Sequence, residues 1–276
     1  MDFIQAWIVP PEATASAWVY IPTAIAALMI TAISKGGFGG GVGILSIPLM
    51  LQVAGVWFVL GLWLPVLIAC DLATIRNYPK EWNPRAFGHL APGMLVGIAV
   101  ATFFLDGANP KNSTAESKQL DAWMKLTVAA ISVVFVAIQL RPVREQKEAW
   151  QPTWAVSLPV GIMAGLTTMV AHAAGPIITM FMLPQRMEKR VFVGTTGRFF
   201  FIFNSLKVPF MWWIQLVTLS TLKYGLWLML LGPLGVWLGS WLNKHLSALW
   251  FVRAVYLSLV VATAKMVYDA VAFLRA

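Results

Sequence analysis

Six glycines fall within eight residues, at positions 36, 37, 39, 40, 41 and 43. Glycine is about 1 kcal/mol worse than alanine at each helix position, so this stretch predicts a break in a helix that restarts near Val42. Free backbone N–H groups at a helix start, together with the helix dipole, favour an anion. Gly39, Gly40 and Gly41 therefore predict an anion site, although the same glycines would also allow close helix packing.

A second interruption reads His172-Ala173-Ala174-Gly175-Pro176. Gly175 would let a ligand approach the backbone there, and His172 titrates near neutral pH and could handle substrate or protons. Lys35, beside the first break, could attract an anion. Hydroxyl groups near the two breaks could donate to an oxyanion or bond back to helix carbonyls, and the sequence leaves both readings open for Ser34, Thr167 and Thr168.

Ionisable residues also lie inside apolar segments. Arginine costs roughly 2.5–3.5 kcal/mol at the centre of a membrane helix, so Arg198 predicts a cavity-facing substrate ligand. A salt bridge to Asp71 or snorkelling to the interface are its alternatives. Asn204 could donate to an anion, whereas Asp71 fits a proton site or an arginine partner better than a substrate ligand. Lys207 is expected to snorkel to the outer interface.

These residues must be positioned by membrane helices, because the 276 residues are 59% hydrophobic and only 11% charged. Soluble domains usually carry about 25% charged residues. The fold class is therefore an all-α polytopic membrane protein, a single membrane domain over residues 1–276. Apolar segments are expected at residues 13–33, 42–56, 57–75, 90–105, 124–140, 154–170, 176–184, 191–213, 224–242 and 255–274. The piece at 176–184 is too short to span and predicts a re-entrant hairpin.

The two halves can be aligned at one offset, which places Gly61 on Gly194 and Asp71 on Asn204. It also superposes the two breaks. We therefore expect repeats over residues 13–140 and 153–274, each with a broken or re-entrant helix pair followed by about three membrane helices. Whether the first pair is re-entrant or two full crossings stays open.

Loop charge sets the orientation of these helices. The loops at residues 76–85, 141–147, 186–190 and 244–253 carry most of the Lys and Arg residues, so the positive-inside rule places them in the cytoplasm. The N-terminus and the C-terminus are then both outside, in a multi-pass protein of the cell inner membrane. The halves have opposite orientations, which is the inverted repeat of many secondary transporters.

The glycine-rich break leading to Pro48, with the later runs Gly194-Thr195-Thr196-Gly197-Arg198 and Asn204-Ser205-Leu206-Lys207-Val208-Pro209, resembles the sulfite exporter TauE/SafE family. The resemblance covers about residues 21–274. It implies two related halves and the movement of sulfite, sulfoacetate or other sulfur-containing organic anions across the cell membrane. The family's second break is often glycine-rich, whereas this chain has His172 there.

The leading hypothesis is a secondary transporter that exports a small sulfur-containing anion; the alternative is a proton-coupled importer of another anion. A channel would pass ions orders of magnitude faster. An enzyme is not expected, since there is no Gly-x-Ser-x-Gly elbow, and one cysteine with three histidines offers little for a metal site. No P-loop is present, and we expect no cofactor, no metal and no nucleic-acid partner. The partners are the anion and the bilayer, and a homo-oligomer remains open.

Overall fold

The fold is taken from a computed structural model, which describes residues 7–107 and 150–245 together with residues 123, 126–130, 133 and 268. These residues form helices and no strand, apart from one isolated bridge between Ala13 and Ala54. The first half contains α2 (Ala17–Phe38), η1 (Gly41–Leu45), α3 (Ser46–Met50), α4 (Val56–Asn77), η2 (Pro84–Ala86), η3 (Gly88–Leu90) and α5 (Ala91–Gly107). The second contains α7 (Trp154–Ala171), α8 (Ala174–Met182), η5 (Leu183–Gln185), α9 (Lys189–Trp213) and α10 (Leu219–His245).

Within the described part of the chain, five helical stretches are long and apolar enough to cross a membrane: α2, α4, the stretch Pro84–Gly107, α7 and α10. The predicted segments 57–75, 90–105, 154–170, 176–184 and 191–213 match α4, α5, α7, α8 and α9 to within about two residues. α10 begins five residues before the predicted 224–242, and only η1 and the short α3 form where 42–56 was predicted. The expected segments at 124–140 and 255–274 fall almost entirely outside the described residues. The all-helical, multi-pass character of the chain is therefore confirmed.

The helix before the first break is longer than predicted. α2 continues through Gly36 and Gly37 and ends at Phe38, so the expected break after residue 33 was placed too early. Tertiary packing overrides the low helix propensity of these glycines, because α10 lies directly against them. A methyl group added to Gly37 would lie 2.5 Å from the carbonyl oxygen of Gly239.

Both broken pairs fold back as hairpins. The Thr14 N–H donates to the Val53 carbonyl at 2.9 Å, so the chain before α2 meets the chain after α3. In the second half the Trp150 N–H donates to the Pro184 carbonyl at 3.0 Å, joining the chain before α7 to the chain after α8. The first pair, which the sequence left open, is therefore a hairpin like the second.

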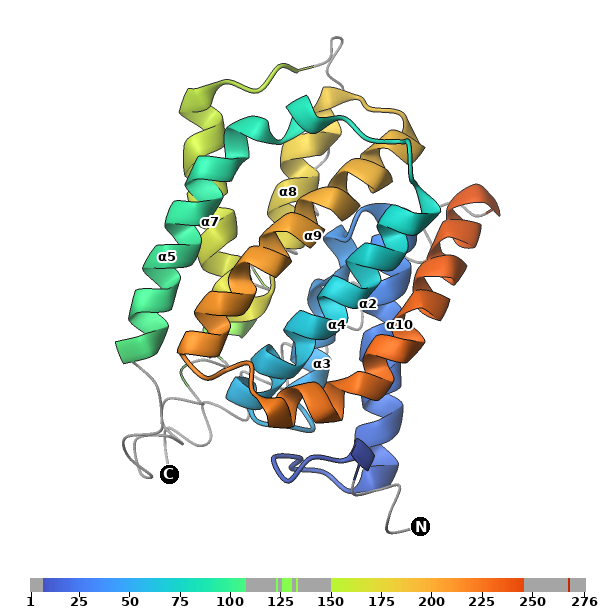
Figure 1. Cartoon of the computed structure of the whole chain (residues 1–276), viewed down its shortest axis with the longest axis vertical. Coiled ribbons are helices and arrows are strands. Elements are labelled where there is room, and N and C mark those ends of the chain that lie inside the picture. Colours follow the sequence, from blue (N-terminus) through green and yellow to red (C-terminus); the bar gives the residue numbers. More distant parts are fainter. Residues whose placement is uncertain are drawn as a thin grey trace.

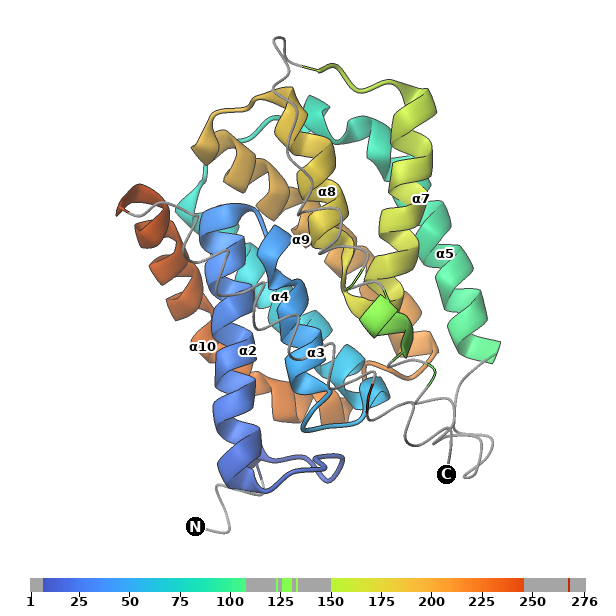
Figure 2. The same ribbon diagram turned by 180° about the vertical axis from the view of Figure 1, so that it is seen from behind.

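Figure 1 shows that corresponding helices of the two halves run in opposite directions. α2 and α4 rise from the end marked N, whereas α7 and α9 descend toward it. α5 packs on α7 and α10 packs on α2, so the last described helix of each half lies against the first helix of the other. Seen from behind in Figure 2, α3 lies beside α2 and α8 lies beside α7.

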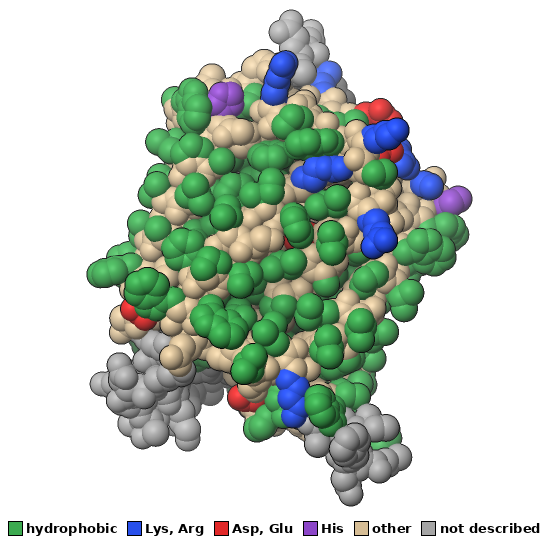
Figure 3. Space-filling view, viewed as in Figure 1, with side chains coloured by type: hydrophobic (Ala, Val, Ile, Leu, Met, Phe, Trp, Pro, Cys, Tyr) green, Lys and Arg blue, Asp and Glu red, His purple; other side chains and the backbone are tan. Residues whose placement is uncertain are grey.

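Lys and Arg side chains gather at one end of the molecule, the upper end of Figure 3, which is called the cation-rich end below. Arg190 there forms an ion pair with Glu81 at 2.7 Å, and the Gln185 side chain donates to the Ala86 carbonyl at 3.1 Å, which ties the α8–α9 loop to the α4–α5 loop. The hydrogen bond from Arg190 lowers the pKa of Glu81. The predicted grouping of the loops at 76–85 and 186–190 at one end is therefore confirmed.

Candidate functional site

Both breaks end their helices with the same backbone geometry. Gly39, with φ 70°, closes α2, and His172, with φ 49°, closes α7. The Gly40 N–H donates to the Ser34 carbonyl at 3.0 Å, and the Ala173 N–H donates to the Thr167 carbonyl at 3.3 Å. Glycine adopts positive φ without cost, whereas a histidine there is uncommon and requires support from its surroundings.

The two breaks lie in direct contact. A methyl group added to Gly175, at the start of α8, would lie 2.5 Å from the carbonyl oxygen of Gly40. One added to Gly41 would lie 2.6 Å from the Thr179 hydroxyl. The two interruptions therefore meet, and Gly41 and Gly175 allow the close packing that the sequence offered as the alternative to an anion site.

The glycines do not present the row of bare amides that the sequence suggested. The Gly40 N–H is already bonded to Ser34, and the chain restarts as the short 3₁₀ turn η1 rather than as a full helix at residue 42. Gly39 faces the ring of Phe192. Of the predicted glycines, Gly40 and Gly175 line the small cavity described below.

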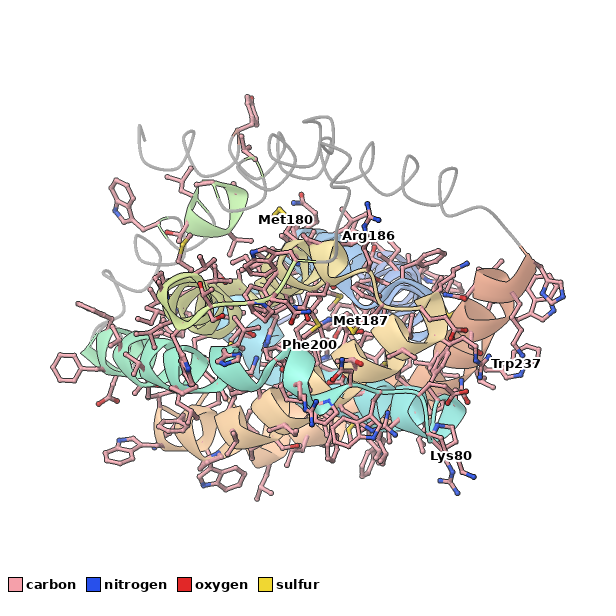
Figure 4. The ribbon with its side chains drawn as sticks, turned by 90° about the horizontal axis from the view of Figure 1, so that it is seen from above. Lys80, Met180, Arg186, Met187, Phe200 and Trp237 are labelled. Atoms are coloured by element: carbon pink, nitrogen blue, oxygen red, sulfur yellow. The ribbon has the colours of Figure 1, made fainter. Side chains whose placement is uncertain are left out.

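Side chains one helical turn apart converge on this junction from four helices. α2 contributes Thr31 and Lys35, α4 contributes Trp63, Leu67 and Asp71, the end of α7 contributes Thr168 and His172, and α9 contributes Phe200, Asn204 and Lys207. Figure 4 shows Phe200 near the middle of the helix bundle and Lys80 at its rim. The convergence places polar groups where the surrounding core is apolar.

Lys35 and Asp71 form a buried ion pair. The second carboxylate oxygen of Asp71 accepts a hydrogen bond from the Asn204 amide at 2.7 Å, which links α4 to α9. The Lys35 ammonium also lies 4.7 Å from the centre of the Phe200 ring, a cation–π contact. The partner of Asp71 is therefore a lysine and not the arginine that the sequence suggested.

Lys207 does not snorkel to the interface, so that expectation was wrong. Its side chain is fully buried, and its ammonium donates to the Thr168 hydroxyl at 2.9 Å and contacts His172 Nδ1 at 3.1 Å. His172 Nε2 in turn lies 2.9 Å from the Leu60 carbonyl oxygen. The break between α7 and α8 shields the lysine from lipid and supplies polar partners, which removes the reason to snorkel.

A cavity of about 30 Å³ lies at the junction of the breaks. Its walls are Thr31, Lys35, Gly40, Gly43, Ser46, Trp63, Leu67, Thr168, His172, Gly175, Phe200 and Asn204. Trp63 and Thr31 are buried to 0% and 1% exposure, and among the described residues neither the indole Nε1 nor the hydroxyl has a hydrogen-bond partner. Buried polar groups without partners are uncommon, and a bound water, ion or ligand is one explanation for them.

Besides Gly39 and Gly41, three predicted ligands stay outside this cavity. Arg198 donates to the carbonyls of Tyr78 at 3.0 Å, Gly194 at 3.1 Å and Pro79 at 2.6 Å, at the cation-rich end. Thr167 bonds back to the Met163 carbonyl at 2.9 Å, which is the alternative left open for it. Ser34 is buried at the first break, where its carbonyl caps the helix end.

Sequence reasoning missed Trp63 and Thr31 and misplaced Lys207. One signal could have placed Lys207, because it follows Asn204 by three residues and so shares its helix face. In the sequence, nothing distinguishes Trp63 from the other thirteen tryptophans. The proton roles suggested for Asp71 and His172 stay predictions.

Comparison with known proteins gives one family. The model of the sulfite exporter TauE/SafE family matches residues 24–266. No curated protein and no solved structure matches the chain. The match spans both halves and both breaks, and the chain belongs to the sulfite exporter TauE/SafE family.

Proposed function

We propose that this membrane protein is a secondary transporter that exports a small sulfur-containing anion, such as sulfite or an organosulfonate, across the cell inner membrane. Membership of the family supports the transport of a sulfur anion. The observation that carries the proposal is the cavity between the two breaks, which Lys35, Trp63 and Thr31 line together. The Trp63 indole and the Thr31 hydroxyl have no hydrogen-bond partner among the described residues. A buried cavity with an excess of donors favours a negatively charged solute.

We infer an inverted repeat from equivalent interactions at a constant offset of 133 residues. The left-handed residues Gly39 and His172 differ by this number. So do the bonds from the Gln52 amide to the Pro48 carbonyl and from the Gln185 amide to the Phe181 carbonyl, both 3.3 Å long. The opposite helix directions in Figure 1 also support inversion. Asp71 and Asn204, which the offset pairs, bond to each other, as residues on a pseudo-twofold axis would.

The cation-rich end is proposed to face the cytoplasm, following the positive-inside rule. The end of α4, the α4–α5 and α8–α9 loops, the start of α9 and the end of α10 lie there in Figure 1, and they carry Arg76, Lys80, Arg85, Arg186, Lys189, Arg190 and Lys244 against Glu81 and Glu188. The opposite end, where the Lys223 ammonium lies 4.6 Å from the centre of the Trp7 ring, then faces outward with the start of α2. An outer location of the C-terminus remains a prediction, because residues 246–276 lie outside the described part except for Tyr268.

The size of the cavity favours a carrier over an open channel. A volume of about 30 Å³ suits a single water molecule. An oxyanion with four heavy atoms can enter only if the walls separate, so each passage requires a conformational step. With the cell interior negative, outward movement of one anion is downhill by about 2.3 kcal/mol per 100 mV, and export needs no coupling ion.

The test is sulfite flux from liposomes that contain the purified protein, under an imposed membrane potential. Efflux should accelerate when the lumen is negative and should saturate with concentration, as expected for a carrier. Trp63→Phe should slow it, because the indole N–H is lost while an aromatic ring, smaller by one fused ring, remains at this position. Lys223→Met, at an exposed lysine away from the cavity, is the matched control. Absence of sulfite flux, or flux that ignores the potential, would overturn the proposal.

A further inference from the structure

The charged groups around the cavity do not balance. Lys35 is neutralised by Asp71, whose second oxygen is engaged by Asn204. Lys207 has only the neutral partners Thr168 and His172 among the described residues. The charged groups that act on it electrostatically are Lys35 and Asp71. When both lysines are protonated, the cluster therefore carries one positive charge in excess.

The hydrogen bonds of His172 indicate its protonation state and therefore its contribution to the net charge of the cluster. A carbonyl oxygen can only accept, so the ring nitrogen facing Leu60 must carry the proton. In the neutral ring Nδ1 is then an acceptor, and it receives the N–H of Lys207 at 3.1 Å. A doubly protonated ring would direct a second N–H at the ammonium group, so His172 is neutral in this arrangement and leaves the excess charge on Lys207.

The two buried donors without partners indicate which kind of solute the excess positive charge would attract. The Trp63 indole can only donate a hydrogen bond, and the Thr31 hydroxyl is free to donate. Both are buried and line the cavity together with Lys35. A solute that satisfies them needs acceptor oxygens and one negative charge. A second negative charge would remain uncompensated in a buried site, which is strongly unfavourable.

We propose that the cavity selects singly charged oxyanions over doubly charged ones, with Lys207 as the counter-charge and Asp71 as the residue that excludes the dianion. This inference rests on the proposed function and narrows its substrate to hydrogensulfite or a sulfonate with a single charge. It excludes the doubly charged sulfoacetate that the family resemblance implies. Asp71 sets the limit because its carboxylate cancels one of the two lysines. Replacing it by the neutral Asn would leave two positive charges and should favour a dianion.

The test compares methanesulfonate with sulfate, two tetrahedral sulfur oxyanions that differ by one charge. Binding to the full-length protein in detergent is measured by isothermal titration calorimetry at neutral pH. The wild type should bind methanesulfonate at least about tenfold more tightly than sulfate, because one unpaired charge distinguishes them. Asp71→Asn should shift this ratio toward sulfate by about tenfold or more. Lys207→Met should weaken both anions, and Lys223→Met should bind as the wild type does.

Lys207→Met serves as the second charge variant if Asp71→Asn does not fold. It leaves only the mutually neutralised Lys35–Asp71 pair beside the cavity and should weaken methanesulfonate by about tenfold. Sulfate binding as tightly as methanesulfonate in the wild type, or ratios that do not respond to the charge variants, would overturn the inference and leave anion transport intact. Failure of the wild type to bind either anion would instead count against the proposed function itself.

Discussion

The contact between the two breaks can be tested by adding a single methyl group. In Gly175→Ala the new Cβ would lie 2.5 Å from the carbonyl oxygen of Gly40, whereas ordinary contact begins at 3.4 Å. The two backbones would have to separate by about 0.9 Å, since neither atom belongs to a flexible side chain. Overpacking of this kind costs about 1–3 kcal/mol.

The same displacement should impair the site. Gly40 and Gly175 both line the cavity, so the groups around the anion would move by a similar distance. A misplacement of about 1 Å can lower activity about a hundredfold. We therefore expect Gly175→Ala to unfold at a lower temperature and to lose most of its sulfite flux in liposomes.

Gly55→Ala is the matched control for this experiment. Gly55 has φ −64°, and an added methyl group would meet no atom within 4 Å. It should keep the wild-type melting temperature and flux. A Gly175→Ala variant indistinguishable from Gly55→Ala in both measurements would refute the reasoning that the breaks touch.

Three further predictions concern Arg198, Thr168 and the ion pair between Arg190 and Glu81. Arg198→Ala should destabilise the fold by about 1–3 kcal/mol through its lost carbonyl bonds, while methanesulfonate affinity stays unchanged in calorimetry; a loss of affinity would return Arg198 to the site. Thr168→Val should lower the affinity for methanesulfonate about tenfold, because the Lys207 ammonium loses a hydrogen-bond acceptor. Thr167→Val should leave the affinity unchanged, because the Thr167 hydroxyl bonds back to its own helix. Equal effects of the two substitutions would contradict this prediction. Because Arg190 lowers the pKa of Glu81, their ion pair stabilises the fold above that pKa and is lost as the pH falls through it. Glu81→Gln should therefore lower the melting temperature at neutral pH, and this difference should disappear once the pH is below the lowered pKa of Glu81. A constant difference across pH would exclude the pair as the cause.

Much of the architecture could be predicted from the sequence because lipid imposes strong rules on it. Apolar length placed α4, α5, α7 and α10 to within a few residues, and the short run before Pro184 identified one re-entrant arm. The end of α2 could not be placed in this way. Whether Gly36 and Gly37 stay helical depends on α10, which lies about 200 positions further along the chain and packs directly on them.

The site was predicted only in part, for a similar reason. Break geometry and local polarity identified Lys35, His172 and Asn204, since each stands out against an apolar segment. Which cation pairs with Asp71 depends on how helices pack, and the structure gives Lys35 rather than Arg198. Trp63 could not be singled out, because its indole N–H matters only once the surrounding helices leave it without a partner.

The most direct test is to locate the anion itself. Crystals soaked with selenite, an analogue of sulfite that scatters anomalously, would give a peak for the bound selenium atom. The proposed site predicts this peak at the junction of the two breaks, with selenite oxygens within hydrogen-bond distance of Trp63 Nε1 and Lys35 Nζ. A peak found only beside Arg198 at the cation-rich end, with none between the breaks, would contradict the central claim.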